Sequence, residues 1–319
     1  MVGEINNVPT ADQLIQAATR IRPFVNKTPV FTSNTLNHLL EAEVFLKCEN
    51  FQKVGAFKAR GAMNAILQLT PLERQAGVAT HSSGNHAQAL SWGASILEIP
   101  AYIVMPANSS RVKVNDVKDY GGQVTFCEPT LEARESTLEK ILKEKKATEI
   151  HPYNNFNIIC GQSTATIELL DEIANLDIVM APVGGGGLLS GTSLAVHYFS
   201  PGTKVIAAEP ENASDAFQSF YSQKFIPSVN PDTIADGLRT SLGSLTFPII
   251  LKYVDEIVTV SEPSIIHATR WIWERMKILI EPSSAVTVAA LLEGKINIEG
   301  KRVALIISGG NVDLDHLPW

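Results

Sequence analysis

The sequence has few cysteines and no long apolar run. Its three cysteines, Cys48, Cys127 and Cys160, lie far apart and form no CxxC pair, so we expect neither a disulfide framework nor a zinc cluster. The strongest apolar run, residues 303–307, is far too short to cross a membrane. The first residues, MVGEINNVPT, lack the basic and apolar regions of a secretion signal. We therefore expect a cytoplasmic protein without a membrane partner.

The sequence also lacks an excess of basic residues. Lys and Arg number 26 against 33 Asp and Glu, which gives a net charge of −7. Nucleic acid is therefore not an expected partner, because its phosphates require clustered cations. The 319 residues, of which 45% are hydrophobic, suffice for about two domains. No repeat or Pro/Gly/Ser-rich linker separates two halves, so we expect the domains to be interleaved.

From residue 77 onward, short β-branched runs alternate with amphipathic segments. This spacing is typical of βαβ units and predicts an α/β fold, with parallel sheets that carry helices on their faces. A helix is predicted over 60–69, and the segment 70–73 reads as a capping box with proline at the first helical position. Parallel sheets of this kind bind ligands at the carboxyl ends of their strands. Strands are predicted at 77–81, 101–105, 124–127, 149–153, 177–183, 205–208, 257–260 and 303–307.

Four consecutive glycines, residues 184–187, join the strand 177–183 to a predicted helix over 188–196. Without side chains, their N–H groups can approach an anion, and the helix adds its positive end. No Walker lysine follows, and Leu189 occupies the third glycine position of GxGxxG. The alternative is a tight turn alone, but four glycines carry an entropic cost that a turn does not require. We favour a phosphate site.

Small polar residues follow the strand 77–81 in the segment 82–86, Ser-Ser-Gly-Asn-His. Hydroxyls and free N–H groups at a helix N-terminus suit a carboxylate, and Ser83 can exchange a proton with a bound ligand. The alternative is N-capping without a ligand. His81 and His86 are too few and wrongly spaced for a metal site.

Lys58 lies among apolar residues just before a predicted helix. Such an amine can have a lowered pKa and act as a base or form an imine, although many lysines simply extend along apolar surface into solvent. The strand 303–307 ends in Ser308 and two glycines. This hydroxyl can meet the edge of a heterocycle, or it can belong to a polar turn.

A phosphate cradle, an activated lysine, a carboxylate-binding turn and one hydroxyl facing a ring together describe a pyridoxal-phosphate site for an amino acid. The segments FQKVGAFKARGAMNA, SSGNHAQAL, GGGGLLSG, IADGLRTSLG and ISGGNVDL resemble the fold-type-II pyridoxal-phosphate enzymes, in the group of serine racemases and serine/threonine dehydratases. The resemblance implies a tryptophan-synthase-β-like α/β fold and a homodimer. It also implies a large domain of residues 1–77 and 156–319 and a small mobile domain of residues 78–155.

The resemblance assigns roles to single residues. Lys58 matches the lysine that bonds to the cofactor, and Ser308 matches the partner of the ring nitrogen, which leaves the ring a weaker electron sink than an aspartate would. Ser83 matches the residue that serves the second face in racemases, where many threonine dehydratases have alanine. The implied cofactor-binding residues are Phe57, Lys58, Asn85, Gly184, Gly185, Gly186, Gly187, Leu188 and Ser308. The implied substrate-binding residues are Ser82, Ser83, Gly84, Asn85, His86 and Arg134.

The resemblance also implies a cation and a nucleotide. Glu209, the carbonyl of Ala213, and Asp215 match a divalent-cation site, and oxygen ligands suit Mg²⁺, Ca²⁺ or Mn²⁺; their spacing alone would equally describe a solvated acidic turn. ATP activates the eukaryotic members at a site between subunits. Val54 and Ile15 replace a threonine and a glutamate found in relatives, which argues against ATP activation. The matching nucleotide residues are Ser33, Asn34, Lys53, Gln88, Tyr120 and Asn311.

The expected activity is interconversion of L- and D-serine, together with β-elimination of serine to pyruvate and ammonia. Three alternatives stay open: an L-serine/L-threonine dehydratase, a threo-3-hydroxyaspartate ammonia-lyase, and a non-catalytic binding protein, against which Lys58 argues. The segment 153–155, Tyr-Asn-Asn, lacks the serine-rich stretch of aspartate racemases, which argues against aspartate as the substrate.

Overall fold

The computed structural model describes residues 8–109 and 111–319, and in this part of the chain the strands form two sheets. Residues 1–7, where the sequence predicts no secretion signal, lie outside the described residues. The strands are β1 (Val30–Thr32), β2 (Glu43–Cys48), β3 (Val78–His81), β4 (Ala101–Pro106), β5 (Gln123–Cys127), β6 (Thr148–Glu149), β7 (Ile178–Pro182), β8 (Lys204–Pro210), β9 (Glu256–Val260) and β10 (Arg302–Ile307). The six-stranded sheet has the order β1-β2-β10-β7-β8-β9, and the four-stranded sheet has the order β5-β4-β3-β6.

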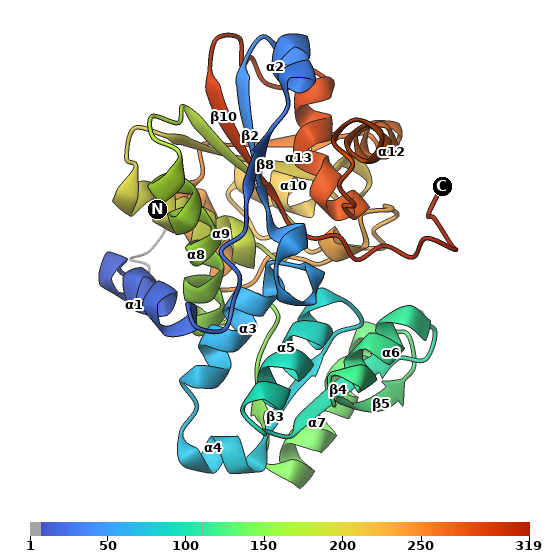
Figure 1. Cartoon of the computed structure of the whole chain (residues 1–319). Coiled ribbons are helices and arrows are strands. Elements are labelled where there is room, and N and C mark those ends of the chain that lie inside the picture. The colour runs from blue at the N-terminus through green and yellow to red at the C-terminus, as the bar shows by residue number, and fades with distance from the viewer. Residues whose placement is uncertain (1–7, 110) are drawn as a thin grey trace.

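Helices cover both faces of the larger sheet (Figure 1). In β10, Val303 and Leu305 belong to the core under α12 and α13, whereas Ala304 and Ile306 belong to the core under α8 and α9. Alternate residues of a strand point to opposite faces, so a strand covered on both faces is apolar throughout. The helices are α1 (Ala11–Ile21), α2 (Asn34–Leu40), α3 (Lys58–Leu67), α4 (Pro71–Ala76), α5 (Asn85–Ile96), α6 (Arg111–Asp119), α7 (Leu131–Lys145), α8 (Phe156–Glu172), α9 (Gly187–Phe199), α10 (Asp215–Ser222), α11 (Thr246–Tyr253), α12 (Glu262–Trp271) and α13 (Pro282–Leu292).

The predicted α/β fold is confirmed, and each of the eight predicted segments contains a strand. The capping box at Thr70 is also present, with both reciprocal hydrogen bonds to Glu73. The prediction of 149–153 was wrong beyond Glu149, where bends begin at residue 152. β1 and β2 were not predicted, and they pair antiparallel, unlike the remaining strand pairs described, which are parallel.

The smaller sheet is inserted in the chain between two strands of the larger one. Its strands and the helices α5, α6 and α7 fall within residues 78–149, after β2 and before β7. Figure 1 shows this part below the larger sheet. We propose that residues 78–155 form a small domain within a large domain of residues 1–77 and 156–319. In the described part of the chain, no helix has the length and apolar character that crossing a membrane requires.

A buried ion-pair network fixes α3 to the larger sheet and to α8. Arg60 is 0% exposed and donates to both oxygens of Glu49, at 2.7 Å and 2.8 Å. Glu168 accepts from Arg60 at 2.8 Å and from Lys47 at 2.7 Å. Removing one partner from such a network costs about 3–5 kcal/mol, because a charge is left buried and unpaired. The network therefore holds the first turn of α3, which begins with Lys58.

Candidate active site

The structure places Lys58 and the predicted loops at the carboxyl ends of parallel strands. Lys58 is the first residue of α3, and Asn85 is the first residue of α5 after β3. The glycine turn joins β7 to α9, and Ser308 follows β10. β7 and β10 end at the same edge of the larger sheet. Asn85, which follows a strand of the smaller sheet, is joined to this edge by hydrogen bonds with Glu281 and Asn311.

The Lys58 amine points into the protein. Its Nζ donates to the carbonyl oxygen of Pro152 at 2.7 Å and lies 5.1 Å from the centre of the Phe57 ring. Burial lowers the pKa of Lys58 to about 8, although the negative charge of Glu281 opposes this effect. A pKa in this range leaves part of the amine neutral near physiological pH, as a nucleophile or a base requires.

Glu281 is a site residue that the sequence analysis missed. It is 4% exposed, and its two oxygens accept from Asn85 Nδ2 at 3.0 Å and 3.1 Å. The backbone N–H of Asn311 also donates to it, at 3.2 Å. Burial raises the pKa of Glu281 to about 7. Its position between Ile280 and Pro282, as one carboxylate at the end of an apolar run before α13, was the available signal.

Ser308 lies beside the start of α3. It is 3% exposed, and its carbonyl accepts from the N–H of Phe57 at 3.0 Å. Its hydroxyl lies 3.0 Å from the hydroxyl of Ser284, in the first turn of α13. Ser284 was not predicted either. The pair provides a neutral hydrogen-bonding group next to Lys58, which fits an unprotonated ring nitrogen.

The glycine turn packs closely against neighbouring residues and also has backbone N–H groups without an acceptor in the described part of the chain. A Cβ at Gly185 would lie 2.3 Å from the Tyr153 ring, and one at Gly184 would lie 2.8 Å from Leu238. Gly186 has a φ of +86°, which favours glycine. Close packing in a tight turn, the alternative to a phosphate site, therefore explains part of the run of four glycines. The N–H groups of residues 184–186 have no acceptor in the described part of the chain, and at the start of α9 they suit a phosphate.

The turn between β3 and α5 borders open space. A Cβ at Gly84 would meet no atom within 4 Å. Ser82 accepts from the N–H of Gly84 at 3.4 Å, whereas the hydroxyl of Ser83 has no hydrogen-bond partner among the residues that the structure describes. His86 instead points into the core: it is 2% exposed, with Nε2 2.9 Å from the carbonyl of Ile150. Its side chain is therefore enclosed by the protein.

Arg134, on α7, lies near the end of β3. Its Nε is buried without a hydrogen-bond partner in the described part of the chain. Its positive charge lowers the pKa of His81, an effect that adds to burial, and it also opposes the rise that burial causes in the pKa of Cys127. The residue after His81 is Ser82, so the guanidinium lies on the small-sheet side of the site.

Glu209 and Asp215 form a buried acidic pair. Glu209 is 0% exposed and accepts from the N–H groups of Ala216 and Phe217 at 2.9 Å and 2.7 Å. Asp215 is 5% exposed, and neither oxygen has a hydrogen bond of ordinary geometry within the described residues. Burial raises the pKa of Asp215 to about 6 and that of Glu209 well above its usual range. Two such carboxylates fit a hard cation; because the described residues include no cluster of three Asp, Glu, His or Cys ligands, backbone oxygens such as that of Ala213 and water would complete its shell.

The predicted nucleotide residues fall into two groups within one chain. Asn311 Nδ2 donates to Gln88 at 3.1 Å and to the carbonyl of Val54, which follows Lys53, at 2.8 Å. Tyr120 packs in the apolar cluster that Val54 contacts. The residues at the start of α2 are elsewhere: Ser33 caps this helix before Asn34 and lines a separate surface groove with Phe31 and Arg275.

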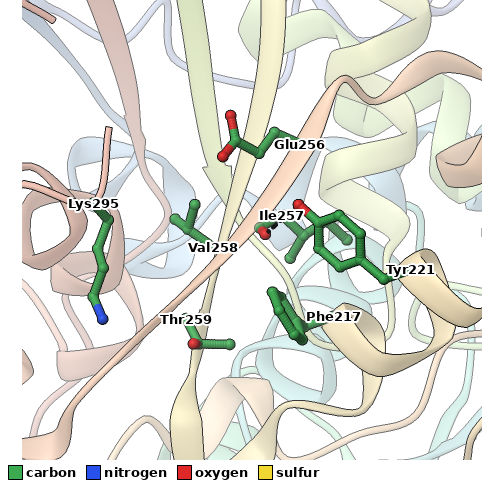
Figure 2. Close-up of a pocket in the computed structure, with 7 residues that line it drawn as sticks. All are labelled: Phe217, Tyr221, Glu256, Ile257, Val258, Thr259 and Lys295. Carbon is green, nitrogen blue, oxygen red and sulfur yellow. Dashed lines mark hydrogen bonds between the residues drawn. The ribbon is translucent and has the colours of Figure 1, made fainter. Parts of the chain in front are cut away.

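A groove of about 280 Å³ lies along the outer edge of β9 (Figure 2). Lys295 at its border pairs with Glu211 and Glu293 at 3.5 Å and 3.3 Å. Its lining includes none of the residues that contact Lys58, and we assign it no catalytic role. The lining residues are Phe217, Tyr221, Glu256, Ile257, Val258, Thr259 and Lys295.

Comparison with known proteins gives consistent matches. The family described as "Pyridoxal-phosphate dependent enzyme" matches residues 21–309. The chain is 48% identical over 313 residues to a serine racemase of Dictyostelium discoideum, which covers 97% of this chain and 96% of the relative. It is 46% identical over 312 residues to a beta-hydroxyaspartate dehydratase of Paracoccus denitrificans, covering 98% and 99%. The crystal structure of the Dictyostelium serine racemase has a TM-score of 0.92 at 47% identity, with 97% of this chain and 100% of that chain covered.

The lowered pKa of Lys58 predicts how the protein without cofactor captures pyridoxal phosphate. Only a neutral amine attacks the aldehyde, so the rate of covalent capture should rise with pH and level off above about 8, instead of near the ordinary lysine value of 10.5. Absorbance after rapid mixing measures this rate.

Borohydride reduction followed by peptide mass spectrometry identifies the lysine. We expect the label on the Lys58 peptide, its loss in Lys58→Ala, and its retention in the exposed control Lys277→Ala. A label on another lysine, or a rate that still rises toward 10.5, would contradict this assignment.

Proposed function

The chain belongs to the family of pyridoxal-phosphate-dependent enzymes, and we propose that it interconverts L- and D-serine and also converts serine to pyruvate and ammonia. Because this family consists of enzymes, the alternative of a non-catalytic binding protein is no longer favoured. Two observations carry the proposal: the half-buried amine of Lys58 has a lowered pKa, and the hydroxyl of Ser83 has no hydrogen-bond partner among the described residues, next to Gly84, which borders open space. The relatives named serine racemase support it.

The residues present fit the cofactor. The free N–H groups of residues 184–186 and the start of α9 would bind its phosphate, and the hydroxyl of Ser308 would face its ring nitrogen. Lys58 would hold it covalently. When bound, pyridoxal phosphate stabilises the negative charge left on the α-carbon of an amino acid after its proton leaves. Because its hydroxyl carries no charge, Ser308 would leave the ring nitrogen unprotonated.

Two groups of the chain then move protons at the α-carbon. Lys58, with a pKa of about 8, can remove a proton from one face and return it. Inversion requires a second group on the other face, and Ser83 is the residue we assign to it. The N–H groups at the start of α5 would bind the substrate carboxylate, because a helix N-terminus favours an anion. Loss of the β-hydroxyl of the same substrate gives the elimination products.

A second candidate is elimination from 3-hydroxyaspartate without racemisation. The relative named beta-hydroxyaspartate dehydratase, which is matched over nearly the full length of both chains, favours it. 3-Hydroxyaspartate has a second carboxylate, which a positively charged side chain would bind. Arg134 lies beside His81 on the small-sheet side, and its Nε has no hydrogen-bond partner among the described residues. A substrate survey with chiral and keto-acid readouts separates the two candidates.

We also propose that Glu209, Asp215 and the carbonyl of Ala213 hold Mg²⁺ or a similar cation. Support comes from the buried carboxylate of Asp215, whose oxygens have no hydrogen bond of ordinary geometry within the described residues and whose pKa burial raises to about 6. A homodimer belongs to the same proposal and rests on the family resemblance. A cytoplasmic location stays a prediction from the sequence, and ATP activation stays an open prediction of the resemblance, against which Val54 and Ile15 argue. Sedimentation of the purified protein tests the dimer, and the rate with and without ATP tests activation.

Serine racemisation predicts a specific product pattern in D₂O. From L-serine, we expect D-serine with deuterium at the α-carbon, together with pyruvate. In Ser83→Ala, racemisation should fall by about 100-fold or more, because one face loses its proton-transfer group, while elimination from L-serine stays within about 10-fold.

Chiral chromatography and a keto-acid assay measure both rates. The exposed control Ser222→Ala should leave them unchanged. Pyruvate without D-serine would leave only the dehydratase, and equal loss of both activities in Ser83→Ala would refute the two-face assignment.

The cation proposal predicts pH-dependent stabilisation. Because the folded-state pKa of Asp215 is raised to about 6, the metal-free protein gains stability from its protonation at low pH and loses that stability as pH rises through 6. Mg²⁺ should therefore raise the melting temperature more above pH 6 than below it, and a chelator should reverse the effect. Asp215→Asn should remove it, unlike the exposed control Asp171→Asn. An equal Mg²⁺ effect in both variants would contradict the site.

A further inference from the structure

His151 lies in the turn that leads from β6 back to α8. Its Nδ1 accepts the backbone N–H groups of Tyr153 at 3.3 Å and Asn154 at 2.9 Å. Its ring stands edge to face with the Tyr153 ring, with centroids 4.6 Å apart. A ring nitrogen that accepts two N–H groups carries no proton, so the imidazole is neutral with its proton on Nε2.

The groups packed around His151 keep the ring neutral. Burial lowers its pKa to about 4, and the positive charges of His81 and Lys58 act in the same direction. The His81 ring lies 6.5 Å away, centroid to centroid, and His86 and Tyr153 are the other titratable neighbours. The Nδ1 acceptor is therefore available throughout the physiological pH range.

The residues that His151 holds contact several parts of the site. The carbonyl of Pro152 accepts from Lys58 Nζ at 2.7 Å. The Tyr153 ring packs directly on the glycine turn, so close that a Cβ at Gly185 would lie 2.3 Å from it.

The same turn is also tied to the large domain. The side chain of Asn154 accepts from the N–H of Leu245 at 2.7 Å, and Asn155 caps α8 by accepting from the N–H of Asn157 at 2.9 Å and that of Ile158 at 3.1 Å. These hydrogen bonds therefore fix the Pro152 carbonyl, which accepts from the lysine amine, relative to Leu245 and the start of α8.

We propose that His151 is a positioning residue for Lys58. Its unprotonated Nδ1 stabilises the conformation of the turn. In this conformation the carbonyl of Pro152 orients the Lys58 amine, and Tyr153 packs on the glycine turn. His151 itself touches neither substrate nor cofactor in this role. The proposal rests on the assigned role of Lys58 in the proposed function. Misplacement of a reacting group by about 1 Å can cost about 100-fold in rate, so the effect should appear in kcat more than in KM.

The test compares His151→Asn with His151→Leu in the cofactor-loaded protein. An asparagine side chain accepts N–H groups two residues further along the chain in Asx turns, and it does not titrate near neutral pH. We expect His151→Asn to keep kcat within about 3-fold and His151→Leu to lose about 100-fold, with KM little changed. The matched control is His197→Leu, an exposed histidine on α9 that also contacts tyrosine rings.

Hydrogen–deuterium exchange of the peptide that contains Tyr153 and Asn154 gives a readout besides activity. These two N–H groups should be protected in the wild-type, His151→Asn and His197→Leu proteins and unprotected in His151→Leu, with exchange in β10 unchanged. Because kcat can be taken from racemisation or elimination, failure of the racemase proposal leaves this test valid. Wild-type kcat and protection in His151→Leu would overturn the proposal, as would loss of both in His151→Asn. If His151→Leu does not fold, the asparagine variant decides alone.

Discussion

The site depends on one hydrogen bond, between a lysine amine and a backbone carbonyl. Lys58 Nζ donates to Pro152, and burial of this amine lowers its pKa to about 8. Both ends of the contact are fixed independently. Arg60 and its buried carboxylate partners hold the first turn of α3, and His151 holds the turn that contains Pro152. The chain thus keeps a half-buried amine partly neutral and holds it in a fixed orientation.

The two sheets meet around this amine. The larger sheet supplies the glycine turn after β7 and Ser308 after β10, and the smaller sheet supplies Ser83 after β3. α3 contacts both parts of the chain. Its Ile66 packs with Leu90 of α5 in the core of the smaller sheet, and Arg60 pairs with Glu49, which follows β2, and with Glu168 of α8. In the proposed domain arrangement, Lys58 belongs to the large domain and Ser83 to the small one. Two proton-transfer groups carried by different domains can approach a substrate from opposite faces.

Local patterns predicted much of the fold and of the site. β-branched runs between amphipathic helices indicated eight strands, and turn chemistry with the family resemblance indicated Lys58, the glycine turn and Ser308. The prediction failed where neighbours distant in sequence decide the structure. β2 contains Lys47, whose buried amine is paired with Glu168, 121 residues further along the chain. Similarly, Glu281 is placed in the site by its hydrogen bond with Asn85, which lies 196 residues away in the chain. No short window of sequence contains both members of such a pair.

The central claim is that Lys58 and Ser83 address opposite faces of one substrate carbon. The most direct test is a crystal structure of the cofactor-loaded protein with serine or an unreactive analogue bound. The account predicts that Lys58 Nζ and Ser83 Oγ lie on opposite sides of the α-carbon, each within about 3.5 Å of it. Both groups on the same side, or a Ser83 hydroxyl turned away from the substrate, would contradict it.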